Sequence, residues 1–135
     1  MTDAGVIFSD LEADTIPRLQ AWLDARAEAA TLGVEVSNAT ETEAFPAVTV
    51  VLGPGLGMVD TIDDTTLRLN VYHEDEAKAS RLALLVRAFF DSIAANGKPI
   101  TRARVTAGPV AVPNKLRVHQ WYMVVNVTRR GTPLT

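Results

Sequence analysis

A long amphipathic segment in the second half of the chain is the feature that most limits how the chain can fold. From about residue 75 to residue 95, apolar residues recur every three or four positions, which is the spacing of one face of an α-helix. Asp75 can cap the start of this helix and Gly97 can stop it. The wide apolar stripe has to be buried against another layer of structure. It consists of Ala79, Leu82, Val86, Phe89, Phe90 and Ile93.

A second amphipathic segment, residues 10–30, lies near the start of the chain. Its stripe has helical spacing, and Gly33 follows its end. Because proline is comfortable only in the first turn of a helix, Pro17 suggests that the helix begins nearer Thr15. The apolar stripe consists of Leu11, Leu19, Trp22, Leu23 and Ala27.

Segments rich in β-branched residues lie between and after the two helices. They predict strands at residues 34–36, 47–52, 66–72, 100–105 and 116–128. The apolar run 121–125 predicts a central strand that is covered on both faces. Gly108, Pro109, Pro113 and Asn114 predict a loop before the last strand.

The order is therefore α-β-β-β-α-β-β. It predicts an α+β fold in which two helices pack on one face of a mostly antiparallel or mixed sheet. The chain has 135 residues, which suits one domain, 1–135, and we expect residues 1–8 and 129–135 to be flexible. It has no cysteine, no apolar run long enough to span a membrane, and no basic segment typical of a signal peptide. These features suit a protein made in a reducing cytoplasm.

Charge is distributed unevenly along the chain. Residues 1–77 contain 15 of the 16 acidic residues and three of the 13 basic residues, which gives a net charge of −12. Residues 78–135 have a net charge of +9. In one interpretation the two halves fold together and their charges intermix on one surface. In the other, the molecule has an acidic side and a basic side, and copies of it can stack head-to-tail and close into a ring.

A glycine-rich acidic segment, residues 53–64, predicts a loop between strands. Its spacing does not match a dinucleotide-binding motif, and it leads into a strand rather than a helix, so phosphate binding is disfavoured. The mixture of glycine, acidic and apolar residues predicts contact with a partner instead. The candidate interface residues are Gly53, Gly55, Leu56, Gly57, Met58, Asp60, Asp63 and Asp64.

The sequence gives no catalytic or cofactor-binding motif. His73 and His119 are isolated from each other and lack a convergent set of ligands, so we expect no metal site. No serine lies in the nucleophile motif G-x-S-x-G. The paired acids Asp63 and Asp64 are expected in a loop with no basic or apolar partner to shift their pKa values, which predicts solvated charge. We therefore expect a protein that is not an enzyme and has no catalytic residues, metal or cofactor.

Four basic residues form a second candidate interface. They are predicted to form a strip across two neighbouring strands, which could contact an anionic partner or could be a solvated sheet face. No pattern of aromatic residues among basic ones suggests specific nucleic-acid binding. The four residues are Arg102, Arg104, Lys115 and Arg117.

Several local strings, together with the order of elements, resemble the tail terminator proteins of long-tailed (siphovirus-type) bacteriophages, especially those of actinobacterial hosts. The resemblance covers about residues 8–130. It consists of element order and small-residue punctuation rather than a catalytic signature. The strings are Asp10-Leu11-Glu12 to Ala21-Trp22-Leu23, Phe45-Pro46-Ala47-Val48-Thr49-Val50, Leu67-Arg68-Leu69-Asn70-Val71-Tyr72 followed by Glu76-Ala77-Lys78-Ala79, and Gly108-Pro109-Val110 with Val118 to Val127.

The resemblance implies a structural virion protein of the phage tail and neck, assembled in the host bacterial cytoplasm. Such a protein forms a homohexameric ring at the head-proximal end of the tail tube, stops tube polymerisation and joins the tail to the head connector. The implied partners are further copies of the chain, the tail tube protein and the head–tail connector or stopper protein. DNA passes through the ring without sequence-specific binding, and no membrane or cofactor is involved. The acidic glycine segment has no counterpart in a fixed family motif.

Two alternatives remain open from the sequence. A head-completion or head–tail connector protein of similar size would belong to the same setting. A small enzyme or a nucleic-acid-binding accessory protein would belong to another class, and the enzyme would need a pocket with converging polar groups.

Overall fold

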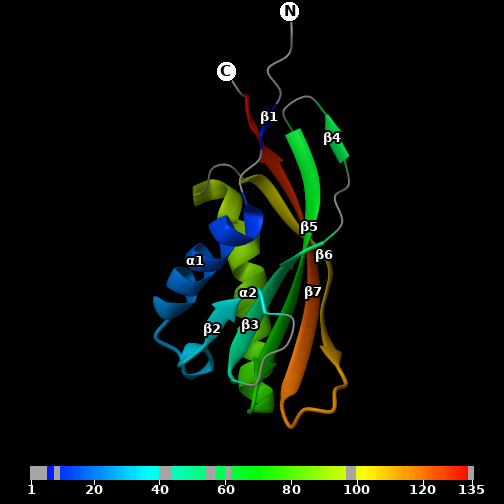
Figure 1. Cartoon of the computed structure of the whole chain (residues 1–135). Coiled ribbons are helices and arrows are strands. Elements are labelled where there is room, and N and C mark those ends of the chain that lie inside the picture. Colours follow the sequence, from blue (N-terminus) through cyan, green and yellow to red (C-terminus); the bar gives the residue numbers. More distant parts are fainter. Residues whose placement is uncertain are drawn as a thin grey trace, which may run out of the picture.

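The computed structural model describes residues 6–7, 10–39, 44–53, 57–59, 62–96 and 100–133. Figure 1 shows two helices lying on one face of a curved sheet, which confirms the predicted α+β class. In chain order the elements are β1 (Val6–Ile7), α1 (Leu11–Asp24), the 3-10 helix η1 (Ala29–Thr31), β2 (Glu35–Ser37), β3 (Ala47–Leu52), β4 (Gly57–Val59), β5 (Ile62–His73), α2 (Glu76–Asn96), β6 (Ile100–Val112), β7 (His119–Arg130) and β8 (Thr132–Pro133).

The main sheet has the strand order β2-β3-β5-β7-β6, and β4 pairs with the beginning of β5. Every pair in it is antiparallel except β2 with β3, so the sheet is mixed as predicted. β1 and β8 form a separate two-stranded ribbon. The main elements follow the predicted order α-β-β-β-α-β-β, whereas β1, β4 and β8 are too short to leave a periodic signal in the sequence.

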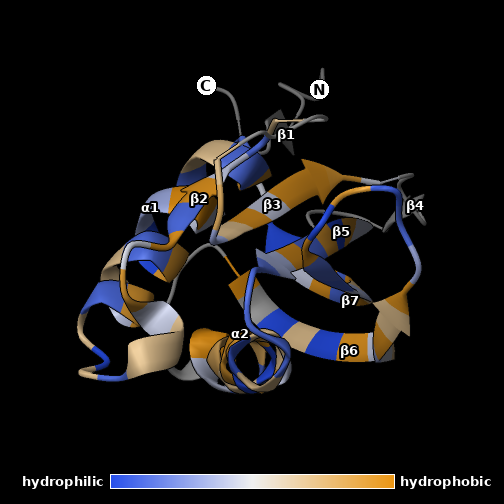
Figure 2. Cartoon of the chain, turned by 90° about the horizontal axis from the view of Figure 1, so that it is seen from below, coloured by the Kyte–Doolittle hydropathy of each residue, from blue (hydrophilic) through white to orange (hydrophobic). Residues whose placement is uncertain are grey.

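Helix α2 forms where the sequence predicts it. The Asp75 carboxylate accepts a hydrogen bond from the amide of Lys78 (2.9 Å), and the Asp75 carbonyl accepts one from Ala79 (2.9 Å), so Asp75 caps the helix. The predicted stripe, from Ala79 to Ile93, is buried against the sheet. Figure 2 shows the sheet curving around α2, which brings β6 close to the helix. Gly97 lies outside the described residues.

Helix α1 differs from its prediction at both ends. It begins at Leu11 with Pro17 inside it, and not near Thr15. The Asp10 carboxylate accepts the amide of Ala13 (3.1 Å), so a capped first turn forms ahead of the proline. The helix ends at Asp24, and Ala27, which was predicted to belong to the stripe, is exposed.

The two C-terminal strands also differ from their predictions. β6 continues through Gly108 and Pro109 to Val112, where the sequence predicted a loop. Irregular register lets the strand pass this point, and Gly108 adopts a positive φ of 79° against the carbonyl of Tyr122, where a side chain would not fit. β7 begins at His119 rather than at Leu116, because residues 113–118 form the turn of the hairpin.

Strand β7 is central but is not fully covered on both faces. Its burial alternates: Met123, Val125 and Val127 are buried beneath the helices, whereas the residues between them are only partly buried. The apolar run of the sequence therefore reflects one core face and one open face. The strand also includes Arg129 and Arg130, which were predicted to lie in a flexible tail, and β8 follows directly. Residues 1–5 and 134–135 lie outside the described residues.

Phe89 provides the test of the core. Its ring is 4% exposed and lies edge-on to Trp22 (5.8 Å between centroids) and to Phe90 (5.0 Å), so it joins α1 to α2. We expect Phe89→Ala to lower the free energy of unfolding by about 3–5 kcal/mol in chemical denaturation. Leu84→Ala, on the exposed side of the same helix, should change it by less than about 0.5 kcal/mol. A loss below about 1 kcal/mol for Phe89→Ala would contradict this core assignment.

Candidate interaction surfaces

The open face of the sheet carries two arginines side by side. Arg102 and Arg104 project from β6 on the same face and are both exposed, as predicted. Their cross-strand neighbours on β7 are Thr128 and Asn126. Together with Asp64 these four residues line a hollow of about 380 Å³ whose lining is entirely polar. The hollow suits a charged or hydrogen-bonding partner group better than an apolar ligand.

The predicted strip of four basic residues does not exist as one surface. Lys115 and Arg117 lie in the turn between β6 and β7. This turn follows the C-terminal end of β6, whereas Arg102 and Arg104 lie near its N-terminal end. Nine positions separate Arg104 from Pro113, the first residue of the turn. At about 3.3 Å per residue along a strand, Lys115 and Arg117 therefore lie roughly 30 Å from Arg102 and Arg104. The prediction was wrong because it placed Lys115 and Arg117 on a strand beside Arg102 and Arg104.

The glycine-rich acidic segment is only partly a loop. Gly57 and Met58 belong to β4, which pairs with the start of β5, and Asp63 and Asp64 lie in β5 itself. Gly53 donates its amide to the carbonyl of Thr66 (2.7 Å) at the end of β3. Gly55, Leu56 and Asp60 lie outside the described residues, so contact of this segment with a partner stays a prediction.

Asp63 and Asp64 are not solvated charge. The Asp63 carboxylate forms an ion pair with Arg129 (3.2 Å), and the two side chains are only 17% and 10% exposed. Asp64 accepts a hydrogen bond from the hydroxyl of Thr128 (2.6 Å). The register of β5 against β7 places these residues opposite one another, whereas they are more than 60 positions apart in sequence. Sequence spacing therefore gave no signal of either contact.

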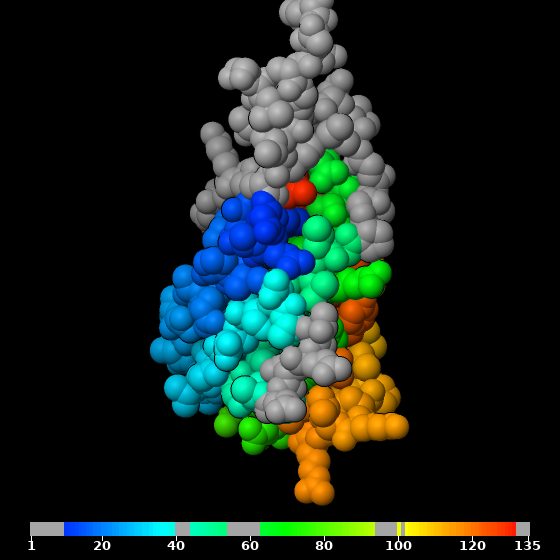
Figure 3. Space-filling model, viewed as in Figure 1, coloured from blue at the N-terminus to red at the C-terminus, as the bar shows by residue number. Residues whose placement is uncertain are grey.

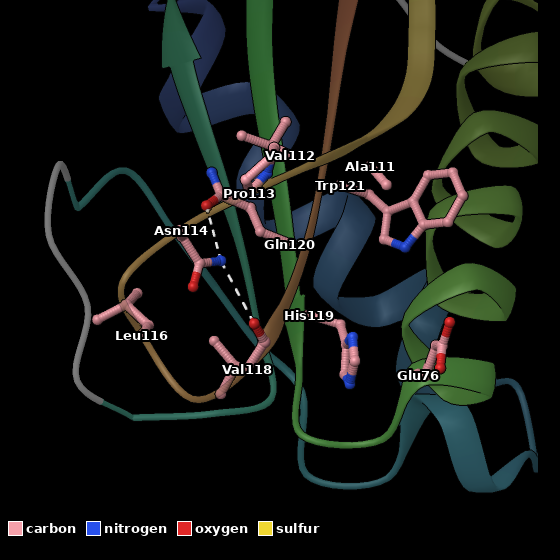
Figure 4. A pocket seen from close by; sticks show the side chains of 10 residues that line it. All are labelled: Glu76, Ala111, Val112, Pro113, Asn114, Leu116, Val118, His119, Gln120 and Trp121. Atoms are coloured by element: carbon pink, nitrogen blue, oxygen red, sulfur yellow. Dashed lines mark hydrogen bonds between the residues drawn. The ribbon is translucent and has the colours of Figure 1, made fainter.

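The same register brings the two histidines together. His73 and His119 are direct partners across β5 and β7. Burial lowers the pKa of His73, and its Nδ1 accepts the amide of Asp75 (3.1 Å). His119 is exposed, and Figure 4 shows its ring lying toward Glu76 at the start of α2. Within the described residues, no three histidine, aspartate or glutamate side chains are placed to hold a metal ion.

A projecting hairpin carries exposed apolar side chains at its end. We call residues 110–119 the hairpin tip. Asn114 organises its turn by donating to the Val118 carbonyl (3.3 Å) and to Gln120 (3.2 Å), as Figure 4 shows. Leu116 is 47% exposed and lines a hollow of about 320 Å³, and Val110 of β6 is 50% exposed. The sequence indicates the charges of this tip but not its apolar residues, because a single apolar residue between charged ones forms no periodic pattern that would show which way its side chain points.

A second exposed apolar residue lies at the opposite edge of the sheet. We call residues 28–34, between α1 and β2, the Leu32 turn. Leu32 is 79% exposed, and the hollow of about 450 Å³ beside it includes Asp24, Arg26 and Glu28 in its lining. The edge of β2 beyond this turn is occupied by Gln20 of α1, whose amide donates to the Val34 carbonyl (2.9 Å) and accepts the Val36 amide (2.8 Å). Because Gln20 satisfies these groups, the edge is closed to a further strand.

Comparison with known protein families and with curated protein sequences finds no match to this chain. No helix in the described part of the chain is both long enough and apolar enough to cross a membrane.

The ion pair of Asp63 and Arg129 is a buried link between the two halves of the chain, where the start of β5 pairs with the end of β7. We expect Asp63→Asn to lower the free energy of unfolding by about 1–3 kcal/mol, because it removes the charge that faces a buried guanidinium. Asp91→Asn is the matched control, since Asp91 is 60% exposed and its pair with Arg87 is long, at 3.9 Å. Equal effects of the two substitutions in urea denaturation would show that the buried pair contributes nothing specific.

Proposed function

We propose that this chain is a structural protein of a long-tailed bacteriophage, the tail terminator that caps the head-proximal end of the tail tube as a ring. The ring would stop tube polymerisation and then bind the head–tail connector. The resemblance of residues 8–130 to that family suggests the assignment. The observation that carries it is the separation of acidic and basic segments onto opposite edges of the sheet.

The strand order produces this separation. β2, β3 and β5 come from the acidic half of the chain and lie together, and β7 and β6 come from the basic half and lie together. Residues 10–39, at one edge, contain six acidic and two basic residues, whereas residues 100–131, at the other, contain six basic residues and no acidic one. Figure 3 shows the first of these segments, in blue and cyan, on the other side of the molecule from the orange hairpin.

Some of this charge is neutralised inside the subunit. Glu28 pairs with Arg81 of α2 (2.8 Å), and Asp63 pairs with Arg129. Arg102, Arg104, Lys115 and Arg117 take part in none of the ion pairs found among the described residues. The charges of these four residues thus remain available to a neighbouring copy of the protein. Opposite charges on two different surfaces of one subunit favour head-to-tail contacts, which close into rings.

The hollows of the described surface support a binding protein rather than an enzyme. In the polar hollow beside Arg102, the Thr128 hydroxyl donates to the Asp64 carboxylate (2.6 Å), and the lining contains no histidine, lysine or cysteine that could complete a catalytic set. The hollow at the hairpin tip contains Glu76 and His119, and the rest of its lining is apolar or amide-bearing. Acid–base chemistry alone would need a substrate site that converges on this pair.

Electron microscopy of the purified protein mixed with tail tubes tests the proposal. A tail terminator adds one ring to one end of each tube and prevents further growth of that end. A head-completion or connector protein leaves the tubes bare and binds the portal side of the head. An enzyme or an accessory protein binds neither, and either of these results would overturn the proposal.

Ring formation should depend on the salt concentration and on the basic residues of β6. The Debye screening length shortens from about 10 Å at 0.1 M salt to about 3 Å at 1 M. The rate of assembly, measured by light scattering, should therefore fall markedly over that range. Arg102→Glu combined with Arg104→Glu should reproduce the high-salt rate at low salt, because steering by opposite charge acts mainly on encounter.

Arg87→Glu is the control, since Arg87 is exposed and belongs to α2 rather than to β6 or the hairpin turn. It should leave the salt dependence unchanged. Assembly kinetics that do not vary with salt would mean that the charges balance within each folded subunit.

A further inference from the structure

Leu32 has the largest exposed fraction among the large apolar side chains of the described residues, at 79%. It is held outward by its neighbours. Thr31, just before it, is buried, and its hydroxyl donates to the carbonyls of Arg26 (2.8 Å) and Glu28 (3.1 Å). Val34, two residues later, is buried as well, and Gly33 between them has a positive φ of 73°. These contacts therefore order the turn and hold Leu32 in a position exposed to solvent.

The Leu32 turn is also fixed to the body of the protein. Glu28 forms two hydrogen bonds with the guanidinium of Arg81 on α2, at 2.8 and 3.2 Å. Gln20 holds the strand that follows the turn. Because these contacts order the backbone before any partner arrives, binding through Leu32 would lose little conformational entropy.

The hairpin tip has complementary properties. Leu116 is half-exposed, and Lys115 and Arg117 lie on either side of it in sequence. The hydrogen bonds of Asn114, and that from Gln120 to Asn70 of β5 (2.7 Å), order the tip as well. The surroundings of the Leu32 turn have a net charge of −1, because exposed Asp24 and Glu35 are offset in part by exposed Arg26, and Glu28 is paired with Arg81. Each surface thus has an apolar centre with a charged rim, and the signs of the rims are opposite.

The two surfaces are too far apart to meet within one molecule. The Leu32 turn leads into β2 at one edge of the sheet, and the hairpin tip joins β6 at the other edge. Four steps between strands at about 4.8 Å each separate the edges by roughly 19 Å. Figure 1 shows the two surfaces on opposite sides of the molecule but toward the same end.

We infer that the Leu32 turn of one copy docks against the hairpin tip of the next copy, with Leu32 packing on Leu116. This contact is heterologous, so repeating it around an axis builds a closed ring. It rests on the proposed function, because it supplies the contact between subunits in that ring. The acidic rim around Leu32 and the basic rim around Leu116 orient one copy on the next.

Thiol cross-linking tests the contact directly, because the natural chain has no cysteine. Leu32→Cys and Leu116→Cys are made singly and together, and each protein is treated with a short bifunctional maleimide, both free in solution and on capped tail tubes. The double variant should give a ladder of covalent oligomers. An equimolar mixture of the two single variants should give covalent dimers, and neither single variant should cross-link alone. A single variant that cross-links alone would reveal a two-fold contact and would overturn the inference.

A polar substitution gives an independent measurement. Leu32→Gln and Leu116→Gln should each raise the dissociation constant between subunits about tenfold or more, because each removes apolar area from the centre of the contact. Leu52→Gln is the matched control, since Leu52 is 44% exposed at the end of β3 and outside both surfaces. Unchanged affinity in the first two variants would overturn the inference.

The outcomes separate this inference from the proposed function. Rings that cap tubes without the expected cross-links would retain the function and overturn the contact. A wild-type protein that forms no ring and caps no tube would overturn both.

Discussion

The rest of the fold depends on the ladder between β5 and β7. Its register is continuous from Ile62 paired with Arg130 to His73 paired with His119, and α2 lies between the two strands in sequence. This ladder joins the N-terminal strands β2, β3 and β5 to the C-terminal hairpin and creates one core face for both helices. Because β-strand side chains alternate with a period of two, a shift of one residue would expose Leu67, Leu69 and Val71 to solvent. The core thus fixes the register, and the register fixes every contact between the halves.

Contacts between the two halves of the chain neutralise part of the charge that each half carries. Where the halves meet, opposite charges are paired, as Asp63 is with Arg129 and Glu28 with Arg81. Away from these contacts, the β2 edge of the sheet keeps the acidic charge of the N-terminal half, and the β6 edge keeps the basic charge of the C-terminal half. Exposed ion pairs contribute little to affinity, so in the proposed ring apolar residues such as Leu32 and Leu116 would supply most of the binding between copies. Charge would then set orientation and encounter rate.

The interaction surfaces follow from the way the sheet ends at each edge. Gln20 closes the β2 edge with its side-chain amide, so a neighbouring copy in the proposed ring would meet the Leu32 turn there rather than a free strand. At the other edge, β6 has irregular register and contains Pro109, features that discourage pairing with another strand. Both edges therefore disfavour the addition of a further strand, and the proposed contact uses side chains instead.

The sequence by itself determined the α+β class, the order of the main elements, the buried stripe of α2 and the cap at Asp75, because these depend on local periodicity and on hydrogen bonds between near neighbours. It located Arg102 and Arg104 on one face for the same reason. Only the tertiary structure decided that β6 passes through Gly108, that Asp63 faces Arg129, that His73 faces His119, and that Lys115 lies far from Arg104. Those facts depend on pairing between strands that are distant in sequence, and strand propensity carries no information about register. The outward position of Leu32 was likewise decided by the burial of Thr31 and Val34 around it, which no pattern of apolar residues records.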